Sequence, residues 1–221
     1  MPARFRAAAA LTVLLLLSGC ARPPPDADPA PSVTASPQES PASALPDGCS
    51  EPSPPSDAAF DAALHDELIA MFERDQAGRL GTGADDEGDQ ARTERLREII
   101  DAHGWPGFDL VGEDGEDAAW TIAQHSDLDP EFQRCALAHL RVAVDAGQGS
   151  PGNLAYLDDR IAAGAGEPQR YGTQVACGPD GPAPATPLVD ADGIDEVRAT
   201  VGLPPYDEYL AEMAEICGGD G

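Results

Sequence analysis

The chain contains 221 residues, of which 40 are acidic and 13 basic, and its formal net charge is −27 at pH 7. Every basic residue is an arginine. A chain this acidic is a poor partner for nucleic acid and for anionic lipid surfaces, because both attract proteins that carry a basic face.

The first 19 residues predict a bacterial lipoprotein signal peptide. Two arginines precede an apolar run from Ala7 to Leu17, which is too short to span a bilayer comfortably and is typical of an export signal. The sequence Leu17-Ser18-Gly19-Cys20 matches a lipobox, in which the cysteine receives a diacylglyceryl group. We therefore expect Cys20 to carry acyl chains such as palmitate, which would anchor an extracytoplasmic lipoprotein to the cell membrane.

Residues 20–56 predict a disordered tether. This segment is rich in Pro, Ser and Ala and has almost no apolar side chains, so that folding could not offset the loss of chain entropy. The tether would separate the anchored cysteine from a single globular domain, which we place at residues 57–217.

The domain opens with a predicted helix that is capped by Asp57. The inward stripe of this helix continues to Asp75, and Arg79 follows one turn later at the spacing of an i,i+4 ion pair. The apolar members of the stripe are Phe60, Leu64, Leu68, Met71 and Phe72. A glycine-rich acidic loop over residues 80–90 then leads to a second helix, which ends at Gly104.

Polar side chains interrupt the apolar pattern near the end of a predicted helix at residues 118–125. Trp120 and Gln124 share one line of this helix and Asp127 continues it, while His125 lies on a neighbouring line. A buried amide or carboxylate costs a few kcal/mol unless it is hydrogen-bonded. These groups therefore need partners.

The following helix begins at Asp129, an N-cap that precedes a first-turn proline. On this helix Gln133 and His139 fall on the inward stripes, whereas Arg134 and Arg141 fall on the opposite, solvent-facing side. A buried polar network that fixes the register of the two helices is one interpretation of this pattern.

The C-terminal third combines helices with a short sheet. A helix over residues 152–166 carries Asp158 within its apolar stripe, so we expect Asp158, like Gln133, to be buried and hydrogen-bonded. The predicted strands cover residues 169–175 and 186–189 with a Pro/Gly-rich connection, and the last helices cover residues 194–201 and 206–216. The domain is thus expected to be mainly α, with six or seven helices and a small two-stranded β-hairpin.

A series of short motifs runs through the globular part. The motifs are Asp75-Gln76-x-x-Arg79, Gly104-Trp105-Pro106, Ala119-Trp120, Gln124-His125-x-Asp127, Asp129-Pro130-x-Phe132-Gln133, Asp159-Arg160, Tyr171-Gly172-Thr173-Gln174 and a closing stretch from Gly202-Leu203-Pro204 to Tyr209. In this order they resemble an uncharacterised bacterial helical family that is classed as a domain of unknown function. The resemblance implies a mostly helical fold and brings no activity, substrate or catalytic residue.

The remaining cysteines indicate disulfides. Outside the cytoplasm four thiols would oxidise, and three pairings of Cys49, Cys135, Cys177 and Cys217 are possible. We favour Cys49–Cys217, since both lie at the edges of the domain, which leaves Cys135 with Cys177. One disulfide together with a buried free Cys135 is the alternative. The spacing matches no zinc-binding pattern, and neither a metal nor another cofactor is expected.

A polar cluster is the candidate site. The sequence contains no G-x-S-x-G elbow, P-loop or dinucleotide fingerprint, so nucleophilic catalysis finds little support. We expect three polar segments to meet, at the end of the 118–125 helix, at Asp159-Arg160 and at residues 171–174. The members are Gln124, His125, Asp127, Gln133, Asp159, Arg160, Tyr171 and Gln174, with secondary candidates Asp75, Gln76, Arg79, Trp105 and Trp120.

Two functions compete for this cluster. The first, which we favour, is a binding or interaction module for a small molecule or cell-wall fragment, held by amides and by stacking on a tryptophan. The second is a hydrolase-like enzyme in which Asp127 or Asp159 orients His125 as general base and Arg160 holds an anionic group. A purely structural polar core is a third reading, and the sequence leaves the oligomeric state open.

Overall fold

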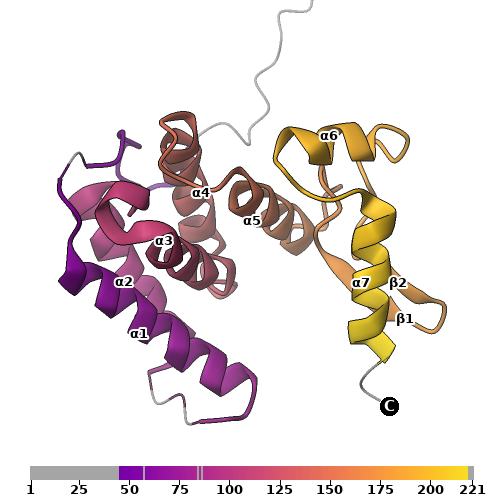
Figure 1. Ribbon diagram of the computed structural model, residues 1–221, viewed down its shortest axis with the longest axis horizontal. Coiled ribbons are helices and arrows are strands. Elements are labelled where there is room, and N and C mark those ends of the chain that lie inside the picture. Colours follow the sequence, from indigo (N-terminus) through magenta and orange to yellow (C-terminus); the bar gives the residue numbers. More distant parts are fainter. Residues whose placement is uncertain (1–44, 57, 84, 86, 219–221) are drawn as a thin grey trace, which may run out of the picture. The chain divides into compact units, whose positions relative to one another are not determined.

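A computed structural model describes residues 45–56, 58–83, 85 and 87–218 of the chain (Figure 1). Within them, seven helices and one two-stranded antiparallel sheet confirm a mainly α fold. The elements are α1 (Ala62–Arg79), α2 (Gly88–His103), α3 (Phe108–Gln124), α4 (Pro130–Asp145), α5 (Pro151–Gly164), β1 (Val175–Gly178), β2 (Gly181–Pro184), α6 (Ile194–Thr200) and α7 (Tyr206–Gly218). The predicted signal peptide and Cys20 lie outside the described residues.

Side-chain caps set where several helices begin. Asp61, rather than the predicted Asp57, caps α1 by accepting hydrogen bonds from the backbone N–H groups of Ala63 and Leu64. Asp57 itself lies outside the described residues. Phe60 precedes the helix and is 52% exposed, so its predicted place on the inward stripe is wrong. The predicted cap Asp129 is confirmed by its hydrogen bond from the N–H of Phe132 at 2.9 Å.

The main core lies around α3, which packs against α1, α2, α4 and α5 (Figure 1). Its largest fully buried apolar side chains are Leu68, Met71, Leu96, Ile99, Trp105, Leu110, Ile122, Phe132, Leu140 and Leu157. Burying side chains of this size contributes about 1.5–3 kcal/mol each, which is the main favourable term for the helical part. No helix in the described part of the chain is both long and apolar enough to cross a membrane.

A smaller core joins the C-terminal elements. Ile194, Tyr206 and Tyr209 are buried there, and Tyr156 of α5 packs against them with its ring edge-on to Tyr209. α7 runs along the β1–β2 hairpin and contacts α6, as Figure 1 shows. Tyr156 thus connects α5 of the main core to this second core.

The predicted sheet register is wrong. The hairpin pairs Val175–Gly178 with Gly181–Pro184, so that apart from Val175 it lies inside the segment that is predicted to be only a connection. The two predicted strands do meet, but only at one parallel bridge between Gln169 and Leu188. Because Pro179 and Asp180 form a two-residue turn, and Gly181 after them has a φ of +104°, the chain reverses earlier than the apolar pattern indicates.

Two disulfides are present, Cys49–Cys135 and Cys177–Cys217, which confirms disulfide bonding. The favoured pairing of Cys49 with Cys217 is wrong, and so is the alternative with a free Cys135. Cys177 lies on β1, and α7 packs along the hairpin, so Cys217 near the end of α7 comes within bonding distance of it. Cys49 instead lies against α4. Proximity to the edges of the domain in sequence was therefore a poor guide to proximity in space.

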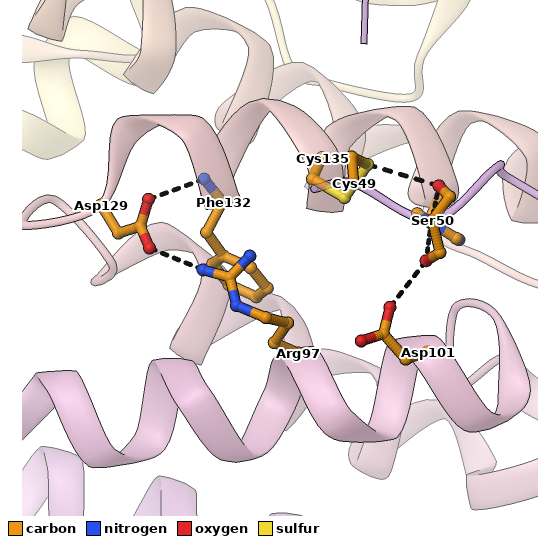
Figure 2. Close-up of a disulfide and its surroundings, with 8 residues drawn as sticks. Cys49, Ser50, Arg97, Asp101, Asp129, Phe132 and Cys135 are labelled. Atoms are coloured by element: carbon orange, nitrogen blue, oxygen red, sulfur yellow. Dashed lines mark hydrogen bonds and ion pairs between the residues drawn. A yellow bond between two sulfur atoms is a disulfide. The ribbon is translucent and has the colours of Figure 1, made fainter. Parts of the chain in front are cut away.

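The C-terminal end of the predicted tether is held against the helical domain (Figure 2). Residues 45–56 contain no helix or strand, but Cys49 is bonded to α4 and the Ser50 hydroxyl donates to Asp101 at 2.7 Å. The N–H of Ser56 also donates to the carbonyl of His103. The remainder of the predicted tether lies outside the described residues.

Glu116 places an ionisable group in the main core. Its side chain is fully buried and accepts hydrogen bonds from the indole N–H of Trp105 at 3.1 Å and from the Asn153 amide at 2.9 Å. Burial raises the pKa of Glu116 to about 7, and the two donors only partly oppose that rise.

This shift makes stability depend on pH. The pKa of Glu116 is near 4.5 in the unfolded chain and about 7 in the folded one. At a pH between these two values, the folded state holds a proton that the unfolded state has lost. The contribution of Glu116 to the free energy of unfolding is therefore complete below pH 4.5 and is lost as the pH rises through 7. The free energy of unfolding changes by roughly 3 kcal/mol over this range. Urea unfolding at several pH values should show this loss in the native protein and not in Glu116→Gln. Glu113→Gln, an exposed change on the same helix, should keep the native pH profile; a profile shared by all three proteins would contradict the assignment.

Candidate functional site

Two adjoining cavities lie where α3, α4 and α5 face the hairpin and α7. The larger has a volume of about 640 Å³ and the smaller about 310 Å³. The side chains of Arg160, Gln174 and Val175 line both, so they form the partition between the two. The larger cavity is also lined by Asp127, Pro130, Gln133, Arg134, Ile161 and Ala185, and the smaller by Trp120, Gln124, His125, Tyr156, Tyr209 and Met213.

Arg160 is the charged centre of the partition. Its guanidinium pairs with both carboxylate oxygens of Asp127, with 3.0 Å between Nε and Oδ1, and Nη1 donates to the side-chain oxygen of Gln174 at 3.3 Å. Burial alone would raise the pKa of Asp127, but the hydrogen bonds and charge of Arg160, aided by Gln133, hold that pKa below its usual value. Asp127 is therefore an anion that neutralises part of the charge of Arg160.

Gln133 connects α4 to the end of α3. Its side chain is buried, as predicted, and its amide nitrogen donates to the carbonyls of Ala123 and Gln124 and, at 3.1 Å, to Asp127. Since the same amide also lines the larger cavity, the two helix ends and the cavity wall are fixed together.

His125 pairs with Asp75, and not with the predicted Asp127 or Asp159. Nδ1 of His125 lies 2.8 Å from Oδ2 of Asp75. Because a carboxylate can only accept, Nδ1 carries the proton and Nε2 keeps its lone pair. Burial lowers the pKa of His125, and nearby Arg79 and Arg160 add to this effect against the opposing charge of Asp75. The imidazole in the wall of the smaller cavity is thus neutral near pH 7.

Asp75 is held by a network behind His125. It is fully buried, and Arg79 donates to it at 3.0 Å, which confirms the predicted i,i+4 pair. Gln76 donates to the same carboxylate at 2.8 Å, and the buried Arg92 lies 3.5 Å away and pairs in turn with Asp85 and Asp89. This network fixes the carboxylate that orients the imidazole.

Aromatic side chains form one wall of the smaller cavity. Trp120 and Tyr156 meet edge-to-face with 6.0 Å between ring centroids, and Tyr156 and Tyr209 meet in the same way at 6.3 Å. The indole N–H of Trp120 is buried and has no acceptor among the described residues. A core selected only for stability rarely leaves such a donor unsatisfied.

Asp159 and Tyr171 do not line either cavity. Asp159 is fully buried and accepts hydrogen bonds from the backbone N–H groups of Arg170, Tyr171 and Thr173 and from the Thr173 hydroxyl. It thus anchors the segment that leads to Gln174. The adjacent Gly172 has a φ of +66°, and an added Cβ would lie 2.8 Å from the ring of Tyr206, so only glycine fits there.

The predicted burial of Asp158 is wrong by one residue. Asp158 is only half-buried and pairs with the exposed Arg141 at 2.6 Å, while its neighbour Asp159 is the fully buried member of the pair. One step along a helix rotates a side chain by about 100°, so the face between two stripes is easily misassigned.

The structure brings together one group of predicted residues and separates others. Gln124, His125, Asp127, Gln133, Arg160, Gln174 and Trp120 line the cavities. Asp75 lies behind His125, with Arg79 and Gln76 bound to it. Trp105 is a core residue whose indole N–H donates a hydrogen bond to Glu116, and it lines neither cavity. Tyr156 and Arg134 were missed, because a tyrosine or arginine on a helix carries no signal of its own in a single sequence.

The comparisons with known proteins concern the domain as a whole. No curated protein and no solved structure matches the chain. The model of a family that is described as "Family of unknown function (DUF6624)" matches residues 62–219, a range that includes all seven described helices, the hairpin and both cavities. The chain therefore belongs to this family of unknown function, DUF6624.

Proposed function

We propose that this protein is a lipid-anchored, extracytoplasmic module that binds a small polar fragment of the cell envelope in the paired cavities. The anchor rests on Leu17-Ser18-Gly19-Cys20, which matches a lipobox. The binding role rests on the neutral and charged hydrogen-bonding groups that line the two cavities.

The observation that carries the proposal is the charge of the larger cavity. In a chain with 40 acidic and 13 basic residues, its lining holds two guanidinium groups, Arg134 and Arg160, and one carboxylate, Asp127. A local excess of positive charge against a strongly negative background favours a ligand that carries a carboxylate. The aromatic wall of the smaller cavity would accept an apolar ring face next to it.

Saccharides and short peptides with a carboxylate combine these features. A sugar ring could stack on Trp120 while its hydroxyls exchange hydrogen bonds with Gln124 and Gln174. Its acidic group would reach the arginines across the partition. Such a ligand must compete with Asp127 for Arg160, so we expect specific but weak binding.

Arg160→Ala tests this role. We expect the substitution to weaken the binding of muramyl dipeptide, an amino sugar whose attached short peptide carries a free carboxylate, at least tenfold, or about 1.4 kcal/mol. Its effect on unfolding should stay below about 1 kcal/mol, because the pair with Asp127 is partly exposed. Titration by NMR and urea unfolding measure the two quantities.

Arg141→Ala is the matched control. Arg141 also forms a partly exposed ion pair, with Asp158, but it lines neither cavity. It should leave the binding unchanged. If Arg160→Ala instead costs several kcal/mol of stability and no saccharide or peptide probe binds the native protein, the cluster is a structural network.

The anchor makes a separate prediction. Cys20→Ala removes the acyl acceptor of the lipobox, so cells should accumulate an unprocessed precursor that still carries residues 1–19. Mass spectrometry of the membrane fraction checks this. A mature native chain that begins at a residue other than Cys20, or that lacks acyl chains, would contradict the assignment.

One observation favours hydrolysis as a second candidate function. Asp75 and His125 form a carboxylate–imidazole pair at 2.8 Å, and the imidazole, with Nε2 unprotonated, lies in a cavity wall. This is the arrangement of a general base that activates water. Turnover of glycoside or peptide probes that disappears in His125→Gln, while binding remains, would establish it. Binding without turnover would leave the protein a binding module.

A further inference from the structure

We propose that Cys49, Cys135 and His139 form a redox-gated site for a soft cation such as Zn²⁺, which binds when the disulfide is reduced. The two sulfurs and a ring nitrogen of His139 all lie within 4.8 Å of one another. Cys135 and His139 are four residues apart on α4 and share one face, and Cys49 reaches them from the segment before α1. The site is distinct from the paired cavities.

His139 offers a buried ring nitrogen close to the two sulfurs. The neutral imidazole is the form that binds a metal ion. Nε2 lies 3.1 Å from the carbonyl oxygen of Ser50, whereas Nδ1 is buried without a partner among the described residues. A buried ring nitrogen with no partner is an uncommon cost in a purely structural core, and this imidazole also has a ring nitrogen within 4.8 Å of both sulfurs.

A hollow adjoins the two cysteines. It has a volume of about 240 Å³ and is lined by both cysteines and by Pro46, Asp47, Gly48, Arg97, Asp129 and Glu131. Figure 2 shows Arg97 bound to Asp129 beside the disulfide. The other two carboxylates, Asp47 and Glu131, leave the entrance with a negative charge, which attracts a cation.

The chemistry is a two-electron exchange followed by metal binding. A dithiol reductant attacks the Cys49–Cys135 bond, becomes a disulfide itself and leaves two protein thiols. A Zn²⁺ ion then displaces both thiol protons and binds two thiolates and one imidazole, with a water molecule as fourth ligand. Reoxidation by a disulfide of the same class removes the thiolates and releases the ion.

The second disulfide supplies an internal comparison. Cys177 and Cys217 would also supply two sulfurs to a cation. Within the described part of the chain, however, no histidine or carboxylate forms a group of three with them. Two sulfurs alone should bind a cation more weakly than two sulfurs and an imidazole.

Cobalt titration tests the proposal. The probe is Co²⁺, whose thiolate complexes absorb in the near ultraviolet, added without oxygen to the full chain with Cys20→Ser, Cys177→Ser and Cys217→Ser. After reduction with a phosphine we expect one Co²⁺ per chain, displaced by Zn²⁺. The oxidised chain should bind none, and His139→Asn should weaken binding at least tenfold.

The comparison chain keeps Cys177 and Cys217 and carries Cys20→Ser, Cys49→Ser and Cys135→Ser. After reduction it should bind Co²⁺ at least tenfold more weakly. Equal binding by the two reduced chains, or an unchanged affinity in His139→Asn, overturns the proposal. Reduction could also loosen the fold, so helical content is followed by circular dichroism with and without Zn²⁺. A reduced chain that binds no Co²⁺, or that unfolds and is not restored by Zn²⁺, overturns it equally.

Discussion

Asp159→Ala is expected to lower the free energy of unfolding by about 4 kcal/mol. The carboxylate is fully buried and accepts from the backbone N–H groups of Arg170, Tyr171 and Thr173 at 2.7, 3.1 and 2.9 Å, as well as from the Thr173 hydroxyl. Alanine would leave several buried donors unsatisfied, at about 1–3 kcal/mol for each that water cannot reach. The segment that positions Gln174 should loosen as a consequence.

Asp158→Ala is the matched control for this substitution. The two aspartates are neighbours on α5, but Asp158 is half-buried and pairs with the exposed Arg141, so its loss should cost below about 1 kcal/mol. Urea unfolding of the two variants measures the difference. Similar losses would mean that the segment after α5 is not held by the Asp159 carboxylate.

Removing the Cys49–Cys135 disulfide is expected to cost about 2–4 kcal/mol. The bond joins residues 86 positions apart, and a cross-link over so long a loop strongly restricts the unfolded chain. Unfolding of the oxidised double variant Cys49→Ala, Cys135→Ala against the native protein measures the loss. The corresponding variant of Cys177–Cys217, which spans 40 positions, should lose somewhat less in the chain-entropy description.

A thiol titration tests the premise of this prediction. In the denatured but unreduced protein, none of these four cysteines should react. Four reactive groups would show that the bonds do not form, and the stability difference would then have another origin.

Features that depend on neighbouring residues could be predicted from the sequence. The Asp129 cap, the Asp75–Arg79 pair and the burial of Gln133 each follow from spacings of three or four residues on one helix, and all three are confirmed. The mainly α class follows from the same periodicity.

Features that depend on distant segments could not be predicted. His125 and Asp75 are 50 positions apart and meet because α1 packs along α3, which no local pattern encodes. The disulfide pairing failed for the same reason, since it depends on the packing of α7 along the hairpin. Cys135 and His139 share a face of α4, but their role as a group became visible only with Cys49 beside them.

Crystals soaked with muramyl dipeptide test the binding proposal most directly. We expect electron density for the ligand in the paired cavities, with its carboxylate within hydrogen-bonding distance of Arg160 and its sugar ring against Trp120, and no such density in crystals of Arg160→Ala. Native crystals in which these cavities stay filled only with water, while the same ligand or a panel of saccharide and peptide fragments binds elsewhere or not at all, would contradict the account.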